Sequence, residues 1–203
     1  MAVAHAKLNL FLKIVGRRAD GYHELESLIA FTEFGDEITV SPADDIHLSI
    51  DGPFAKSLTT SGDNLVVLAA QRLRTLASGA LGARIDLHKN LPVAAGMGGG
   101  SADAAATIRL LLDAWDIDIG DQELVKLAAE LGADVPACLA SQHSYAHGVG
   151  EQLEPVSLPP CGVVLVNPMV PLATPDVLLP IDSPPATLAV PENIRQLSRD
   201  SVT

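Results

Sequence analysis

The run Gly96-Met97-Gly98-Gly99-Gly100-Ser101 is the segment whose composition most clearly suggests chemistry. Four glycines in five positions allow φ angles that other residues avoid and let a ligand approach the backbone N–H groups. The alternation of Ile85 and Leu87 predicts a strand before the run, and residues 102–115 predict an alanine- and leucine-rich helix after it. The start of such a helix offers unpaired N–H donors and a positive dipole end, which together favour an anion such as phosphate.

Two better-known phosphate loops are excluded. The pattern GxxxxGK[ST] is absent, and GxGxxG fails from Gly96 and from Gly98, because the sixth positions are Ser101 and Asp103. Ser101 can offer its hydroxyl to a phosphate or a metal ion, whereas Asp103 is interpreted as support for the first helical turn. A glycine-rich turn can also be purely structural, so the loop alone leaves both interpretations open.

Lys7 and Asp134 are the two charged residues most open to a functional reading. Residues 3–14 place apolar side chains at even positions from Ala6 to Ile14, which predicts a strand whose opposite face carries Lys7 and Asn9. A lone lysine is usually solvated, but a polar pair in an otherwise apolar strand favours a role. Asp134 precedes a proline in the first turn of a predicted helix and is by itself typical of an N-cap.

The remaining elements are predicted from periodicity. Residues 16–25 read as a loop or hairpin, and short strands are expected at 38–40, 46–50 and 162–166. Helices are expected at 63–77, capped by Asp63, and at 122–131, ended by Gly132.

Composition limits the class of protein. The chain has 203 residues, 48% of them apolar, and a net charge of −12, which argues against a nucleic-acid binder. No apolar run approaches the roughly 20 residues of a membrane span, and a signal peptide is not expected, so we predict a cytoplasmic protein. Cys138 and Cys161 lack metal-site spacing. His143 and His147 lie four apart without an evident third ligand, so no dedicated metal site is predicted.

Three segments in collinear order carry a family resemblance. LPVAAGMGGGSADAA resembles the phosphate-binding motif of the GHMP kinases. AKLNLFLKIVGRRADGYHEL and LGADVPACL resemble the branch of that family that phosphorylates 4-diphosphocytidyl-2-C-methyl-D-erythritol. The resemblance implies an α/β (α+β) fold like domain 2 of ribosomal protein S5. Residues 1–155 would form the N-terminal, ATP-binding domain. Residues 156–203, rich in proline, would be a partly disordered remnant of the C-terminal domain.

The resemblance also implies roles. The γ-phosphate of ATP would move to the 2-hydroxyl of the diphosphocytidyl substrate, a step of the non-mevalonate route to isoprenoid precursors, with Mg²⁺ carried by ATP. Lys7 and Asp134 would be catalytic. Lys89 would reach a nucleotide phosphate as a mobile point charge, and Asn64 would contact ATP or simply start a helix. Further ATP-binding residues would be Pro92, Ala94, Gly96, Met97, Gly98, Gly99, Gly100, Ser101 and Ala102. The substrate would be held by Asn9, Tyr22, His23 and Thr174.

The sequence departs from the family at several points. His5 stands where proline is usual, His147 where a charged residue is usual, and Leu178 where an aromatic residue usually walls the base pocket. No glycine follows Gly162, so the glycine motif expected in the second domain is not found. Two alternatives therefore stay open: a GHMP kinase for a smaller alcohol, and a nucleotide-binding chain without catalysis.

Overall fold

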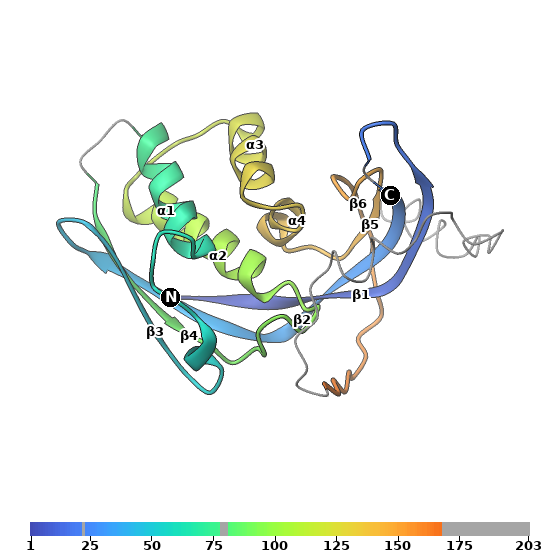
Figure 1. Cartoon of the computed structure of the whole chain (residues 1–203), viewed down its shortest axis with the longest axis horizontal. Helices are drawn as coiled ribbons and strands as arrows, with labels where there is room; N and C mark the ends of the chain where they lie inside the picture. Colours follow the sequence, from blue (N-terminus) through green and yellow to red (C-terminus); the bar gives the residue numbers. More distant parts are fainter. Residues whose placement is uncertain (22, 78–80, 168–203) are drawn as a thin grey trace.

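The computed structural model describes residues 1–21, 23–77 and 81–167 (Figure 1). These residues form a six-stranded sheet, one face of which is covered by helices (Figure 1). The long strand β2 (His23–Pro42) lies between β1 (Ala2–Arg17) on one side and both β4 (Ala83–His88) and β5 (Ser144–His147) on the other. The edges are β3 (Ile46–Asp51), parallel to β4, and β6 (Gln152–Pro155), antiparallel to β5. The expected mixed α/β architecture is confirmed.

Strand β1 is correctly predicted, but its simple alternation is not. The pairing of β1 with β2 shifts register between His5 and Lys7, between Asn9 and Phe11, and between Ile14 and Gly16. Each irregularity moves later side chains to the other face of the strand. Leu10 and Leu12, predicted for the core, are therefore 50% and 46% exposed, whereas the side chain of Lys7 is buried.

Helix α2 (Gly99–Ala114) is the centre of the helical layer and packs against β1, β2, α1 and α4. Its inward face is mostly alanine, with Ile108 and Leu111. Small side chains let a helix approach its neighbours closely. The core is therefore filled at close packing although the chain has few aromatic residues. The glycines 99 and 100 already belong to this helix, which begins earlier than predicted.

The other helices lie near their predicted positions. They are α1 (Leu65–Leu76), α3 (Asp121–Leu131) and α4 (Val135–Ala140), with a 3₁₀ turn η1 (Ala55–Ser57). Gly132 follows α3 as predicted. The cap of α1 is Asn64 and not Asp63, because Asn64 Oδ1 accepts the N–H of Val66. In the described part of the chain, no helix is long and apolar enough to cross a membrane.

The strand predicted at 162–166 is wrong. These residues form no regular secondary structure, and Val164 and Val166 are 89% and 90% exposed. An apolar run becomes a buried strand only where another strand pairs with it, and no described strand lies beside this one. Most of the predicted remnant, 156–203, lies outside the described residues, so the domain boundary at 155 stays a prediction.

Candidate functional site

A cleft of about 1040 Å³ opens where β1, the glycine loop and the starts of α1, α2 and α4 meet. Its walls include Lys7 and Asn9 from β1, Asn64 before α1, and Asp134 before α4. The predicted nucleotide-binding residues that line it, besides Asn64, are Lys89, Pro92, Ala94, Gly96, Met97, Gly98, Gly99, Gly100 and Ser101. Segments more than 120 residues apart in the chain, at Lys7 and Asp134, thus converge on one cavity, as the sequence motifs predicted.

The glycine loop presents backbone donors to this cleft. Ala94, Gly96 and Gly98 have left-handed φ angles of 54°, 73° and 61°, so the chain between Leu91 and α2 is tightly curled. The hydrogen bond from Ala102 N to Gly98 O, 2.8 Å, closes the first turn of α2. The N–H groups ahead of it have no acceptor inside the helix, and they lie at its positive end. Ala102 itself does not line the cleft, and its side chain belongs to the core.

The loop is fixed to β1 beside Lys7. The N–H of Lys7 donates to Met97 O at 2.9 Å. A Cβ atom added to Gly98 would lie 3.1 Å from Lys7 Cβ and 3.2 Å from Lys7 Cε. Gly98 is therefore required by its φ angle and by the passage of the lysine stem across the loop.

The ammonium of Lys7 is directed to Asp134. Lys7 Nζ lies 3.1 Å from Asp134 Oδ1 and donates to Asn9 Oδ1, also at 3.1 Å. Ser27 Oγ donates to Phe11 O at 2.7 Å and to Asn9 Oδ1 at 3.2 Å, which orients the asparagine. The side chain of Lys7 is 4% exposed and that of Asp134 is 51% exposed. The pair therefore joins an enclosed cation to a carboxylate that an incoming hydroxyl can reach.

Asp134 occupies the N-cap position of α4 without capping it. Its side chain makes no capping hydrogen bond, so the default N-cap interpretation is wrong and the carboxylate serves Lys7 instead. At the other end of this short helix, Arg109 Nη1 donates to the carbonyl oxygens of Cys138 and Leu139, at 2.9 and 3.1 Å. Burial lowers the pKa of Arg109 from its usual value. Arg109, which the sequence did not single out, holds the helix that carries Asp134.

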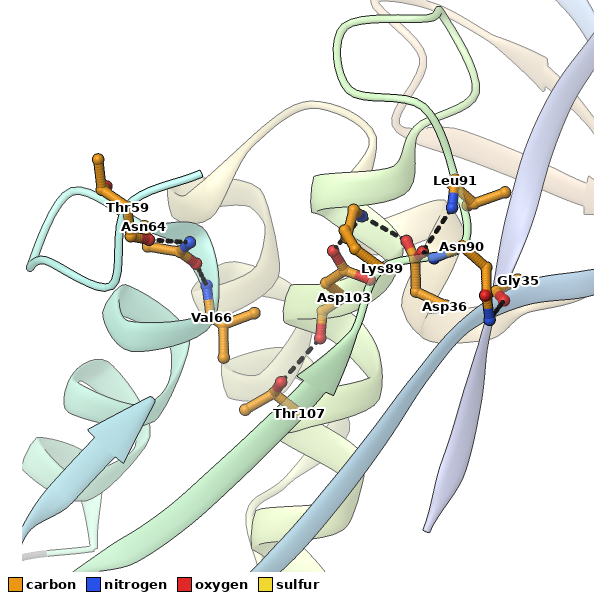
Figure 2. Close-up of polar contacts among 10 residues, drawn as sticks. All are labelled: Gly35, Asp36, Thr59, Asn64, Val66, Lys89, Asn90, Leu91, Asp103 and Thr107. Carbon is orange, nitrogen blue, oxygen red and sulfur yellow. Dashed lines mark hydrogen bonds and ion pairs between the residues drawn. The ribbon is translucent and has the colours of Figure 1, made fainter. Parts of the chain in front are cut away.

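Lys89 is not the mobile point charge that the sequence suggested. It is 3% exposed, and its ammonium lies between the carboxylates of Asp36 on β2 and Asp103 on α2 (Figure 2). The distance from Lys89 Nζ to Asp103 Oδ2 is 2.6 Å. We call Asp36, Lys89 and Asp103 the buried triad. Because these three groups hold one another, Lys89 cannot swing toward a ligand.

Asp103 has an unusual electrostatic environment within the buried triad. Burial raises the pKa of Asp103 to about 7, the ammonium of Lys89 acts against this rise, and the carboxylate of Asp36 adds to it. The residue was interpreted from sequence as simple support for a helical turn. No sequence motif pointed to the triad, because Asp36 lies on β2, 53 residues before Lys89 along the chain, although the two side chains meet in space.

Asn64 is committed to the start of α1. Its Oδ1 accepts the N–H of Val66 at 2.9 Å, and its Nδ2 donates to Thr59 O at 2.8 Å (Figure 2). The structure thus bears out the helix-start interpretation, and a contact with ATP stays a prediction because Asn64 also borders the cleft. His23 borders the cleft as well, whereas Tyr22 and Thr174 lie outside the described residues.

No group of three or more His, Cys, Asp or Glu that could hold a metal occurs among the described residues. His143 Nδ1 accepts the N–H of Phe31 at 3.1 Å, and His147 pairs with Glu154 at 3.3 Å. These two histidines therefore serve different structural contacts.

Comparisons with known proteins agree with this geometry. Residues 64–142 match the family described as GHMP kinases N terminal domain. The chain is 49% identical over 191 residues to the 4-diphosphocytidyl-2-C-methyl-D-erythritol kinase of Rhodopseudomonas palustris (strain ATCC BAA-98 / CGA009), a match covering 92% of the chain and 62% of that relative. It is 51% identical to the kinase of the same name from Agrobacterium fabrum (strain C58 / ATCC 33970), covering 86% and 60%. The chain thus spans about three fifths of the length of these curated relatives.

Solved structures give the same picture. A crystal structure of 4-(cytidine 5'-diphospho)-2C-methyl-D-erythritol kinase superposes with a TM-score of 0.67 at 39% identity, covering 78% of this chain and 55% of that one. Homoserine kinase from Cytophaga hutchinsonii superposes with a TM-score of 0.58 at 18% identity, over 99% of this chain and 66% of that one, and shows the fold alone.

Proposed function

We propose that the cleft transfers the γ-phosphate of ATP to the 2-hydroxyl of 4-diphosphocytidyl-2-C-methyl-D-erythritol, because residues 64–142 match the N-terminal domain of the GHMP kinases. The observation that carries the proposal is the Lys7–Asp134 pair, 3.1 Å apart, beside a loop of free backbone donors. The relatives that share these segments bear the name of this kinase. The reaction would supply isoprenoid precursors in the cytoplasm.

The pair has the parts that an in-line phosphoryl transfer needs. The exposed carboxylate of Asp134 can accept a hydrogen bond from the substrate hydroxyl and orient its oxygen toward the γ-phosphorus. As the new O–P bond forms, the bond to the β-phosphate oxygen breaks and ADP leaves, while the hydroxyl proton passes to Asp134 or to water. The ammonium of Lys7 stabilises the negative charge that develops between the two oxygens.

The nucleotide would lie along the glycine loop. The left-handed residues Ala94, Gly96 and Gly98 and the start of α2 supply N–H donors for the β- and γ-phosphates, with the hydroxyl of Ser101 beside them. A chain with a net charge of −12 must bind an anion through such local donors. Mg²⁺ keeps most of its waters and binds through substrate phosphates, so we propose that it arrives on the triphosphate.

The substrate would occupy the end of the cleft lined by Asn9 and His23. An imidazole ring can stack on a pyrimidine and hydrogen-bond its edge. Contributions from Tyr22 and Thr174 remain predictions, and Leu178 lies outside the described residues with Thr174.

An ADP-release assay tests the proposal. The chain is supplied with ATP, Mg²⁺ and in turn 4-diphosphocytidyl-2-C-methyl-D-erythritol, homoserine and phosphomevalonate. We expect release with the first acceptor alone, because only that acceptor presents a cytosine to the His23 end of the cleft. Preference for either smaller alcohol would overturn the substrate. A matched chain, extended by the remaining segment of the Rhodopseudomonas palustris relative, shows how far turnover depends on that segment.

A further inference from the structure

The buried triad lies directly beneath the first residue of α2. It joins three separate elements, because Asp36 comes from β2, Lys89 follows β4, and Asp103 is on α2. A Cβ atom added to Gly99 would lie 3.3 Å from Lys89 Nζ and 3.6 Å from Asp36 Oδ2. The charge of this cluster therefore acts on the same loop that faces the cleft.

The charges of the triad do not balance if both carboxyl groups are ionised. Two carboxylates would face one ammonium, and all three side chains are at most 4% exposed. An uncompensated charge in such a place is strongly unfavourable, and a buried carboxyl group usually avoids it by taking up a proton.

The hydrogen bonds decide which carboxyl group takes that proton. Asp36 Oδ1 accepts the backbone N–H groups of Asn90 and Leu91, at 2.6 and 2.8 Å, and its other oxygen faces Lys89. Asp103 Oδ2 accepts from Lys89, but Asp103 Oδ1 is buried without a hydrogen-bond partner among the described residues. Both oxygens of Asp36 are thus occupied by donors, and Asp103 Oδ1 is the oxygen with room for a proton.

Other ionisable groups around α2 are directed elsewhere. On β1, Lys7 pairs with Asp134 before α4, and Arg109 binds carbonyl groups at the end of α4. Arg74 of α1 pairs with Asp45, and the thiol of Cys138 on α4 has a pKa raised by burial to about 12. Lys89 and Asp36 are therefore the charges that govern Asp103.

We propose that Asp103 is a positioning residue that carries a proton in the working protein and so keeps the buried triad neutral beneath the phosphate loop. A neutral triad leaves the positive end of α2 available to phosphate. An ionised Asp103 would add one negative charge under the loop and repel the same phosphate. This inference rests on the proposed function only for the identity of the ligand.

Proton binding and nucleotide binding are then linked. If ionisation of Asp103 weakens the binding of ADP, bound ADP must in turn hold the proton on Asp103 more tightly. A unit charge beneath the loop that would hold the phosphate, at the effective dielectric constant of a protein edge and partly screened by salt, would change affinity by about tenfold. By reciprocity, ADP raises the pKa of Asp103 by about one unit.

The test combines a titration with a binding measurement. The chain is labelled with ¹³C at aspartate carboxyl carbons, and the signal of Asp103 is the one lost in Asp103→Asn. We expect that signal to titrate at about 7 in the free protein and about one unit higher with saturating ADP. The ratio of the ADP dissociation constant of the unmodified chain to that of Asp103→Asn should rise from about 1 at pH 6 to about 8 at pH 8.5, on its way to a limit of about 10. Because the carboxamide is neutral at both pH values, the variant lacks the added repulsion.

Asp113→Asn, an exposed change on the same helix, is the matched control and should leave the ratio flat. Titration of the Asp103 signal below pH 5 would overturn the protonation, and a pH-independent ratio for Asp103→Asn would overturn the effect on phosphate. Absence of ADP binding by every chain would overturn the proposed function and the positioning role with it. In that case the titration of the free protein still decides the protonation separately.

Discussion

The protein contains two lysine–carboxylate clusters that differ in how far their carboxyl groups are exposed to solvent. The first, Lys7 with Asp134, has an enclosed ammonium and a carboxylate that is 51% exposed in the cleft. In the second, the buried triad of Asp36, Lys89 and Asp103, each side chain is at most 4% exposed to solvent. The two clusters flank the same glycine loop, since Lys7 contacts Gly98 and Lys89 lies against Gly99.

The difference shows how the surroundings of an ion pair decide what it can do. A carboxylate that is half exposed keeps a place for a substrate hydroxyl, so it can take part in a reaction. A carboxylate such as Asp36, whose oxygens are taken by Lys89 and by backbone N–H groups, has no place for a substrate hydroxyl and holds the fold instead. The sequence shows two lysines near apolar segments and cannot show this difference.

Replacing Lys89 by methionine should give the largest effect on stability. The change leaves Asp36 and Asp103 buried without their cation, and breaking a buried ion pair in this way costs about 3–5 kcal/mol. Urea unfolding at pH 7.5 measures the loss. Lys126→Met, an exposed change on α3, should stay within about 0.5 kcal/mol. Equal stabilities of the two variants would mean that the triad does not support the fold.

The pH dependence of stability separates the two clusters further. The pKa of Asp103 is raised to about 7 from its usual 3.8, so the folded state holds a proton that the unfolded state releases within this window. The resulting stability is fully present below pH 3.8 and is lost as the pH rises to about 7. As the pH rises through this window, the free energy of unfolding of the unmodified chain should therefore fall relative to that of Asp103→Asn, by up to about 1.4 kcal/mol per pH unit. Parallel curves from urea titrations would contradict this.

A pair of glycine substitutions tests the packing of the loop against Lys7. Gly98→Ala places a methyl group 3.1 Å from Lys7 Cβ at a φ of 61°, and should cost about 1–2 kcal/mol. Gly100→Ala meets only Leu65 Cδ1 at 3.5 Å inside a helix, where alanine is favoured by up to about 1 kcal/mol. Thermal unfolding should rank Gly100→Ala above the unmodified chain and Gly98→Ala below it. The reverse ranking would refute the close approach of Lys7 to the loop.

The smallest effect concerns the start of α1. Asn64→Ala removes the cap of Val66 N and should cost about 1 kcal/mol. Asp63→Ala, at the position expected from sequence to be the cap, should cost less, since its side chain accepts from the exposed hydroxyls of Ser61 and Thr59 and does not cap the N–H of Val66. Urea unfolding compares the two variants, and ADP binding by Asn64→Ala decides whether this residue also contacts nucleotide.

Much of the fold followed from periodicity and punctuation. The helices α1, α2 and α3 and the strands β3 and β4 were predicted because their apolar spacing and flanking glycines are local signals. The length of β2 and the bulges of β1 were not, since register depends on the partner strand. For the same reason the exposed run at 162–166 was mistaken for a strand.

The site was predicted unevenly. The sequence pointed to Lys7, Asn9, Asp134 and the glycine loop because each lies within a short, unbroken motif. The structure gathers the three motifs in one cleft. The role of Lys89 was misjudged because its partner Asp36 is 53 residues away. Arg109 was missed because it acts on carbonyl groups, which leave no pattern of residue types.

The central claim is that the exposed cluster acts on the reacting hydroxyl, whereas the buried one supports the fold and sets the charge beneath the phosphate loop. Turnover and ADP affinity of Lys7→Met and Asp134→Asn, measured beside Lys126→Met, test it most directly. We expect both variants to lose about 10²–10⁴-fold in turnover, because each removes a group that the proposed reaction places at the reacting oxygen. ADP affinity should be nearly intact, because the loop donors remain. Retention of turnover by both variants would contradict the account.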